Sequence, residues 1–256
     1  MDRLRILHGV AAGAHLVQAA TSFGFVGYNS KKAYKWPITT TGWQKILQER
    51  TQNVDIGWLI PPFFLLSSVN HSTAFLSERY YKYVLKTRTN PIRWIEYSIS
   101  AGFMTFVLGI LSGVTEQRSL VSILLANMAM QFIGWDIEYR KANGASLREL
   151  FALTLIGWLM FMVIWSQIIA SFACVISFDN KVKAPTIVYA IMTSLFALFC
   201  SFGANQILYI MDYITFEQYE MGFIALSLSA KSILAWQFIG GITAGKQRFK
   251  NTKYAQ

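Results

Sequence analysis

Apolar residues along the chain gather into long runs that short polar segments separate. Seven windows show this pattern, at about residues 6–28, 56–77, 91–114, 120–139, 149–176, 185–211 and 218–244. An α-helix rises about 1.5 Å per residue, so roughly 20 apolar residues cross the hydrocarbon core of a bilayer. The pattern therefore predicts an all-α fold, a rhodopsin-like bundle of seven transmembrane helices in which residues 1–256 form a single domain.

The longest polar segment, residues 29–55, joins the first two windows. It is basic and rich in Thr, and it holds Trp36 and Trp43. A connection of this length without structure of its own is uncommon in a compact domain. We therefore expect a small hairpin in this segment, at the membrane interface.

The composition supports a membrane protein and argues against two other classes. Hydrophobic residues make up 54% of the chain and charged residues 14%, whereas soluble domains carry about 25% charged residues and disordered chains are poor in apolar ones. The net charge of +10 comes from loops and the C-terminal tail, which fits anionic lipid headgroups and leaves no soluble basic module for nucleic acid. Lys and Arg are divided almost evenly between the two sides, so charge bias does not predict the orientation.

Two charged residues lie well inside the windows, at membrane depth. Lys231 is near the middle of the seventh window, and Glu96 lies inside the third. A lone charge at the bilayer centre costs about 2.5–3.5 kcal/mol on insertion scales, so each residue should face the bundle interior and have a partner. Glu96 is the only carboxylate expected at this depth, because Asp136, Glu138 and Asp212 are expected at interfacial helix ends.

The amine of Lys231 has apolar flanks and cannot reach water by snorkelling. It can stay neutral, or it can form a covalent imine with a carbonyl ligand. The plainer reading is a lysine in a water-filled transporter cavity, paired with a carboxylate. A protonated imine would be a buried cation, for which Glu96 is the natural counter-ion.

Two serines share helical faces with these charges. Ser100 follows Glu96 by four residues, and Ser227 precedes Lys231 by four. A lone Ser in a membrane helix more often packs or bonds back to a carbonyl. Because one lies on the face of each charged residue, a polar site and simple packing are about equally favoured.

Two histidines suggest a second polar group. His15 lies in the first window and His71 in the second, and both are expected to be buried. A structural histidine is the commoner reading for each alone, but two in neighbouring helices could hold or relay a proton, since histidine titrates near neutral pH. His8 lies near a helix end and is given no role.

Aromatic residues make up 15% of the chain and form stripes on two windows. Trp158 and Trp165 are seven residues apart in the fifth window, and Phe196, Phe199 and Phe202 recur every three residues in the sixth. Such stripes are usually packing or lipid-facing residues. A long conjugated ligand, however, needs a flat slot lined by them.

Motifs of soluble catalysis are missing from the sequence. There is no Walker loop, HExxH or GxSxG, and the three His do not form the clusters of a membrane di-metal enzyme. Both cysteines fall inside apolar runs, which leaves no disulfide framework or CxxC site. We therefore predict neither an enzyme nor a metal site.

Seven helices, a mid-helix lysine in the last and a carboxylate in the third together resemble a microbial rhodopsin. The runs RWIEYSIS at 93–100 and SLSAK at 227–231 are similar to heliorhodopsins, as are His15, His71 and the long first loop. The resemblance covers essentially the whole chain. The sequence departs from the pumping rhodopsins, which carry a second, proton-donating carboxylate on the third helix.

The resemblance implies a light-sensing membrane photoreceptor that binds all-trans retinal as a protonated Schiff base on Lys231, with Glu96 as counter-ion and a slow photocycle. His15 and His71 would form a polar cluster that accepts the proton. The chromophore site would be lined by Ser100, Ser227, Asn127, Met130, Trp158 and Phe199. The resemblance also implies a homodimer among membrane lipids, with the N-terminus cytoplasmic, and a light signal passed to an unidentified partner; we expect it in the plasma membrane.

Two other functions stay open at this point. A light-activated proton channel or transporter of the same fold is compatible with the sequence, because some viral heliorhodopsins conduct protons and a water chain needs few carboxylates. A small-solute transporter could instead use a Lys231–Glu96 pair without any chromophore. That protein would stay colourless in the presence of retinal.

Overall fold

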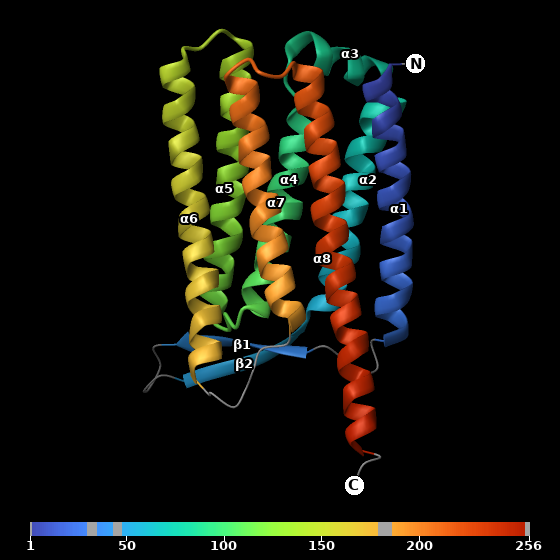
Figure 1. Ribbon diagram of the computed structural model, residues 1–256, viewed down its shortest axis with the longest axis vertical. Coiled ribbons are helices and arrows are strands. Elements are labelled where there is room, and N and C mark those ends of the chain that lie inside the picture. The colour runs from blue at the N-terminus through green and yellow to red at the C-terminus, as the bar shows by residue number, and fades with distance from the viewer. Residues whose placement is uncertain (1, 30–34, 43–47, 179–185, 254–256) are drawn as a thin grey trace.

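The computed structural model is a bundle of long helices that run side by side, with one small sheet at one end (Figure 1). It describes residues 2–29, 35–42, 48–178 and 186–253. The helices are α1 (Arg3–Asn29), α2 (Ile60–Leu76), α3 (Glu78–Thr87), α4 (Pro91–Leu111), α5 (Gln117–Ala142), α6 (Leu147–Phe178), α7 (Thr186–Ile210) and α8 (Phe216–Lys253).

The seven predicted windows correspond to seven of these helices, and the all-α membrane fold is confirmed. Six of them, α1, α4, α5, α6, α7 and α8, are long and apolar enough to cross a membrane within the described residues. The other is α2, which has only 17 residues. It continues directly from the short 3-10 helix η2 (Ile56–Leu59), so the helical path begins where the sequence predicts it.

Local sequence signals explain where the central helix α4 begins and ends. The Asn90 side chain accepts a hydrogen bond from the Arg93 N–H, and a proline follows at the first helical position, where its missing N–H costs nothing. After the last turn, Gly113 has a φ of 94°. Glycine adopts this left-handed conformation readily, so it ends the helix and turns the chain toward α5.

The predicted hairpin is present between α1 and α2. Strands β1 (Lys35–Gly42) and β2 (Gln48–Asp55) pair antiparallel, from Lys35 opposite Asp55 to Gly42 opposite Gln48. The pair lies across the end of the bundle opposite to α3 (Figure 1). Of the two tryptophans that marked this segment, Trp43 lies outside the described residues.

The short helix α3 is an element that the hydropathy pattern did not predict. Ser77 caps it by accepting from the Tyr80 N–H at 3.2 Å. Tyr81 and Val84 are buried, whereas Lys82 and Glu78 form an exposed ion pair at 2.6 Å. Buried residues three apart, with charges on the other face, are the signal of an amphipathic surface helix, which is too polar to register as a membrane span.

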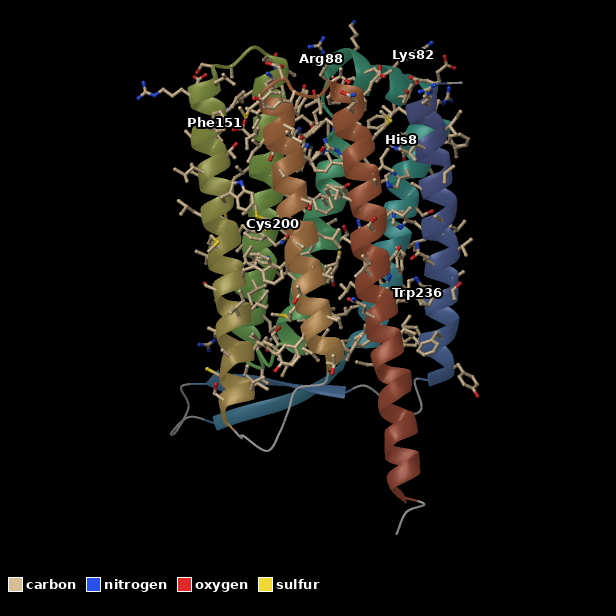
Figure 2. The ribbon with its side chains drawn as sticks, viewed as in Figure 1. His8, Lys82, Arg88, Phe151, Cys200 and Trp236 are labelled. Atoms are coloured by element: carbon tan, nitrogen blue, oxygen red, sulfur yellow. The ribbon has the colours of Figure 1, made fainter. Side chains whose placement is uncertain are left out.

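The outside of the bundle is apolar. On α6, Leu155, Leu159, Met162 and Val163 are each more than half exposed, and side chains project from the outer face of this helix (Figure 2). Exposed apolar surface of this extent is unfavourable in water and favourable in lipid. The long apolar helices and this surface together indicate an integral membrane protein.

Candidate functional site

A buried ion pair joins α4 and α8 in the middle of the bundle. The amine of Lys231 donates to Glu96 Oε1 at 3.0 Å and to Ser227 Oγ at 2.8 Å. The Lys231 side chain is 4% exposed and that of Glu96 is also 4%. The predicted pairing of these two residues is thus present in the geometry, and Ser227 contacts the amine as its spacing suggested.

A third helix also contributes to this pair. Ser67 of α2 donates from its hydroxyl to Glu96 Oε1 at 2.7 Å, so α2, α4 and α8 converge on one carboxylate. The sequence pattern did not predict this contact between Ser67 and Glu96. Ser100 is fully buried, but its hydroxyl has no hydrogen-bond partner among the described residues, and neither has Glu96 Oε2. Both atoms are available to another polar group.

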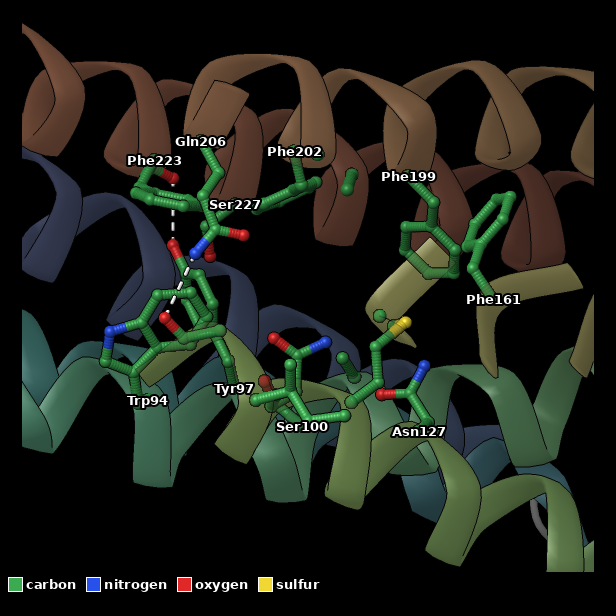
Figure 3. Close-up of a pocket in the computed structure, with 18 of the residues that line it drawn as sticks. Trp94, Tyr97, Ser100, Asn127, Phe161, Phe199, Phe202, Gln206, Phe223 and Ser227 are labelled. Atoms are coloured by element: carbon green, nitrogen blue, oxygen red, sulfur yellow. Dashed lines mark hydrogen bonds between the residues drawn. The ribbon is translucent and has the colours of Figure 1, made fainter. Parts of the chain in front are cut away.

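An elongated pocket lies beside this ion pair, between α4, α5, α6, α7 and α8. Figure 3 shows Trp94, Tyr97 and Phe223 toward one end, with Phe161 and Phe199 toward the other. The lining residues include Trp94, Tyr97, Ser100, Met104, Asn127, Met130, Gln131, Trp158, Phe161, Phe199, Phe202, Gln206, Phe223, Ser227 and Lys231. The pocket is therefore rich in aromatic side chains, and it has an amine in its wall.

All but one of the residues that the sequence assigned to a chromophore site line this pocket: Lys231, Ser100, Ser227, Asn127, Met130, Trp158 and Phe199. The exception is Glu96, the expected counter-ion, which contacts Lys231 but is not a lining residue. Trp165 and Phe196, which belong to the same aromatic stripes, are not among the lining residues; Trp165 is buried in the core beside Phe196, with ring centroids 5.0 Å apart. The stripes thus divide between pocket and packing, a choice that periodicity alone does not make.

Two glycines let aromatic rings lie directly against the backbone of the pocket wall. A Cβ on Gly203 would come within 2.7 Å of the Trp158 ring, and one on Gly134 would overlap Trp94. All four residues line the pocket. These close approaches fix the positions of two large rings, which makes the slot flat.

The pocket fits a long, conjugated, aldehyde-bearing group such as retinal. Its walls supply the flat aromatic surface that such a ligand needs. Lys231 supplies a primary amine, and Glu96 Oε2, Ser100 Oγ and Asn127 Oδ1 are buried polar atoms with no hydrogen-bond partner in the described structure. Buried polar atoms without partners are costly, so their presence in or beside a pocket that has an amine in its wall indicates a ligand with a polar group.

The histidines form a cluster between α1 and α2, beside the ion pair. His71 stacks on His15, with ring centroids 5.5 Å apart, and both are buried. His8, to which the sequence gave no role, also belongs to this cluster (Figure 2). Its Nδ1 lies 3.1 Å from His71 Nδ1, and the side chain is 3% exposed. Near the end of α1 it is covered by α2, so a position close to a helix terminus did not mean exposure.

A second buried charge cluster lies toward the end of the bundle where α3 is found. Arg93 contacts Glu138 and Glu220, and all three are at most 2% exposed. Glu138, expected at an interfacial helix end, does lie in the last turns of α5, but it is buried inside the protein, so Glu96 is not the only buried carboxylate among the described residues. Asp136 and Asp212, by contrast, are exposed, in ion pairs with Arg140 and Lys141. Hydropathy could not separate Glu138 from Asp136, because only packing decides which face of α5 is covered.

Comparisons with solved structures support the fold. The chain is similar to a light-driven proton pump from Leptosphaeria maculans, with a TM-score of 0.72 and 10% identity over 95% of this chain and 97% of that one. It is similar to the transmembrane domain of the rhodopsin phosphodiesterase of Salpingoeca rosetta, with a TM-score of 0.67 and 10% identity over 94% and 84%. Thermophilic rhodopsin from Rubrobacter xylanophilus gives a TM-score of 0.55 and 12% identity over 93% and 95%. At these identities the likeness concerns the fold alone.

The sequence itself matches a protein family, although no curated protein matches it. The family model described as heliorhodopsin matches residues 4–243, which is nearly the whole chain. This match agrees with the resemblance that the residues of α4 and α8 carry. The chain therefore belongs to the heliorhodopsin family, and it is in general terms a membrane photoreceptor that binds retinal.

Proposed function

We propose that this protein is a light sensor in which Lys231 carries all-trans retinal as a protonated Schiff base, with Glu96 as counter-ion. One observation carries the proposal: the amine of Lys231 lies in the wall of an aromatic pocket and 3.0 Å from a buried carboxylate. A lysine of a purely structural ion pair would have no need of the slot. Family membership supports retinal as its occupant.

The residues around Lys231 have separate roles in this proposal. Bound retinal supplies light absorption and a change of shape that moves the nitrogen. Glu96 balances the positive charge, and Ser67 holds the carboxylate by donating to the same oxygen that faces the amine. Ser227 and the Tyr97 ring, 5.0 Å from the amine, add further stabilisation of the cation. Asn127, Met130, Trp158 and Phe199 hold the chain of the ligand.

The proton has a nearby destination on the α1 and α2 side of the site. His15 and His71 are buried, and both nitrogens of His15 lack a hydrogen-bond partner among the described residues. When the nitrogen moves away from Glu96, an imidazole can take up the proton until the site returns to its first state. Separation of the buried charges favours a second helix arrangement, which is how light at this site becomes a signal.

The remaining features of the proposal come from the family. We assign the protein to the plasma membrane as a homodimer with the N-terminus cytoplasmic, a slow photocycle and an unidentified signalling partner, and no enzymatic activity. The apolar outer surface supports contact with lipid. A pull-down from illuminated and dark membranes, compared band by band, tests whether any partner depends on light.

A light-activated proton channel or transporter of the same fold is the second candidate. The structure weakens the argument against it, because Glu138 and Glu220 are additional buried carboxylates on the α3 side of Lys231. Voltage clamp of cells that produce the protein separates the two functions. A photocurrent that follows the proton gradient supports conduction, and its absence in a protein that still absorbs and cycles supports sensing.

The central test is an absorption spectrum of the purified protein after incubation with retinal. We expect a visible band that hydroxylamine bleaches, faster under illumination, because hydroxylamine attacks an imine. Protein that stays colourless contradicts the proposal. Colour that persists in Lys231→Ala contradicts the covalent attachment.

A further inference from the structure

We propose that the cluster of Arg93, Glu138 and Glu220 is a buried proton-binding site, and that Glu220 carries the proton. The cluster joins the start of α4, the last turns of α5 and the start of α8 (Figure 1). It does not line the retinal pocket. The proposal is therefore independent of what Lys231 binds.

The charges in the cluster do not balance. Arg93 Nη2 contacts Glu138 Oε2 and lies 3.0 Å from Glu220 Oε1, so one cation faces two carboxyl groups. Both glutamates are 0% exposed. The other titratable groups near the cluster are the neutral hydroxyls of tyrosines on α3, α4, α7 and α8, and two imidazoles of α1 and α2 that interact electrostatically with Arg93: Tyr80, Tyr97, Tyr209, Tyr219, His8 and His71.

A net negative charge on this buried cluster is strongly disfavoured. Two carboxylates that share one site repel each other, and a low-dielectric surrounding penalises the uncompensated charge. A single proton on one carboxyl removes both costs, because the cluster then holds one cation and one anion. The buried tyrosines cannot supply this balance, since they add no positive charge, and the charge of Arg93 disfavours a positive imidazole at His8 or His71.

The hydrogen bonds indicate which glutamate holds the proton. Glu138 is fully bonded, because Oε1 accepts from the Asn90 N–H at 2.6 Å and Oε2 accepts from Arg93. Asn90 is the N-cap of α4, where the helix dipole also favours an anion. Glu220 accepts from the Asn90 side chain at Oε2, 2.8 Å away, whereas its Oε1 forms no hydrogen bond within the described residues. Glu220 thus has fewer hydrogen bonds than Glu138 to stabilise it as an anion, so it is the carboxyl that holds the proton.

This cluster is separate from the Lys231–Glu96 pair but is linked to it through α4. The two are separated by aromatic side chains, among them Tyr97, whose hydroxyl donates to the Phe223 carbonyl at 2.9 Å. Arg93 and Glu96 are nevertheless only one turn apart on α4. A shift of α4 or α8 changes the distance from Arg93 to Glu220, and the proton is then bound more or less tightly at this end of the bundle.

Infrared spectroscopy of the purified full-length protein at neutral pH tests the proposal. We expect a carbonyl stretching band of a protonated carboxylic acid that shifts in D₂O. Glu220→Gln removes it. Glu138→Gln also removes it, because one cation then faces one carboxylate. Arg93→Gln increases it about twofold, because both carboxyls then take up protons. Glu149→Gln, at an exposed carboxyl on α6, is the control and leaves the band unchanged.

Three results overturn the proposal. They are a wild-type spectrum without such a band, a band that survives Glu220→Gln, and a band lost only in Glu96→Gln. The first needs no variant, so it decides the question even if the substitutions prevent folding. If Glu220→Gln fails to fold, the test uses Glu138→Gln instead, and a band that survives in that variant overturns the proposal.

Discussion

Two buried charge clusters lie close together on α4 and α8, but their surroundings differ. The Lys231–Glu96 pair is balanced one to one and opens onto an aromatic pocket. The cluster of Arg93, Glu138 and Glu220 does not line the pocket, and it joins three helices near one end of the bundle. Burial of charge is therefore not in itself a sign of ligand chemistry. The cavity beside the charge makes the difference.

The largest effect is expected from Lys231→Ala, which should abolish the visible absorption band completely. No other described lysine lies in the pocket wall, so no other amine can attach the ligand there. Lys141→Ala is the matched control, because Lys141 pairs with Asp212 away from the pocket at 2.8 Å and should leave the band intact. Absorption spectra of both variants with retinal make the measurement. Retained colour in Lys231→Ala would show that the Lys231–Glu96 pair, like the cluster of Arg93, Glu138 and Glu220, does not attach the ligand.

Arg93→Gln should destabilise the protein without removing its colour. Breaking a buried ion pair by removing one partner costs about 3–5 kcal/mol. The control is Arg140→Gln, since the ion pair of Arg140 with Asp136 is exposed and such pairs contribute at most about 1 kcal/mol. Thermal unfolding in detergent measures the difference. Equal unfolding midpoints for the two variants would show that the buried cluster contributes no more to stability than the exposed ion pair of Arg140.

Glu96→Gln should move the visible band to longer wavelength. Absorption shifts positive charge away from the nitrogen, so an adjacent anion stabilises the ground state more than the excited state. Without the anion the protonated form should also be lost at a lower pH, because nothing balances the buried cation. A spectrophotometric pH titration measures both effects. Glu138→Gln is the control and should keep the wild-type colour; a matching shift there would mean that both clusters act on the ligand.

The smallest effect is expected from Gly203→Ala, which tests the pocket rather than the charges. The added methyl would meet the Trp158 ring at 2.7 Å, so the ring must move into the slot. We expect slower uptake of retinal and a small shift of the band. Gly13→Ala in α1 is the control, because nothing lies within 4 Å of the added methyl. Uptake followed by absorbance distinguishes them, and equal rates would show that Trp158 does not limit the pocket.

The sequence predicted the central site more completely than the second cluster, for a physical reason. A charge in the middle of a long apolar run, such as Lys231, must be buried wherever the helix packs. Glu138 lies near the end of such a run, where the same pattern is compatible with water, with lipid headgroups or with the interior. Arg93 and Glu220 were equally ambiguous. His8, also near a helix end, was given no role for the same reason.

The order of apolar and polar residues by itself determined that the chain forms membrane helices, where most of them begin and end, and that a lysine and a glutamate face the interior. These properties depend on local hydrogen bonding and on the cost of polar groups in lipid, which every segment meets on its own. Only the tertiary structure decided which side chains meet. Ser67 on Glu96, His8 on His71 and one arginine between two glutamates are contacts between helices, and they depend on the rotation of each helix about its axis, which packing of the whole bundle sets.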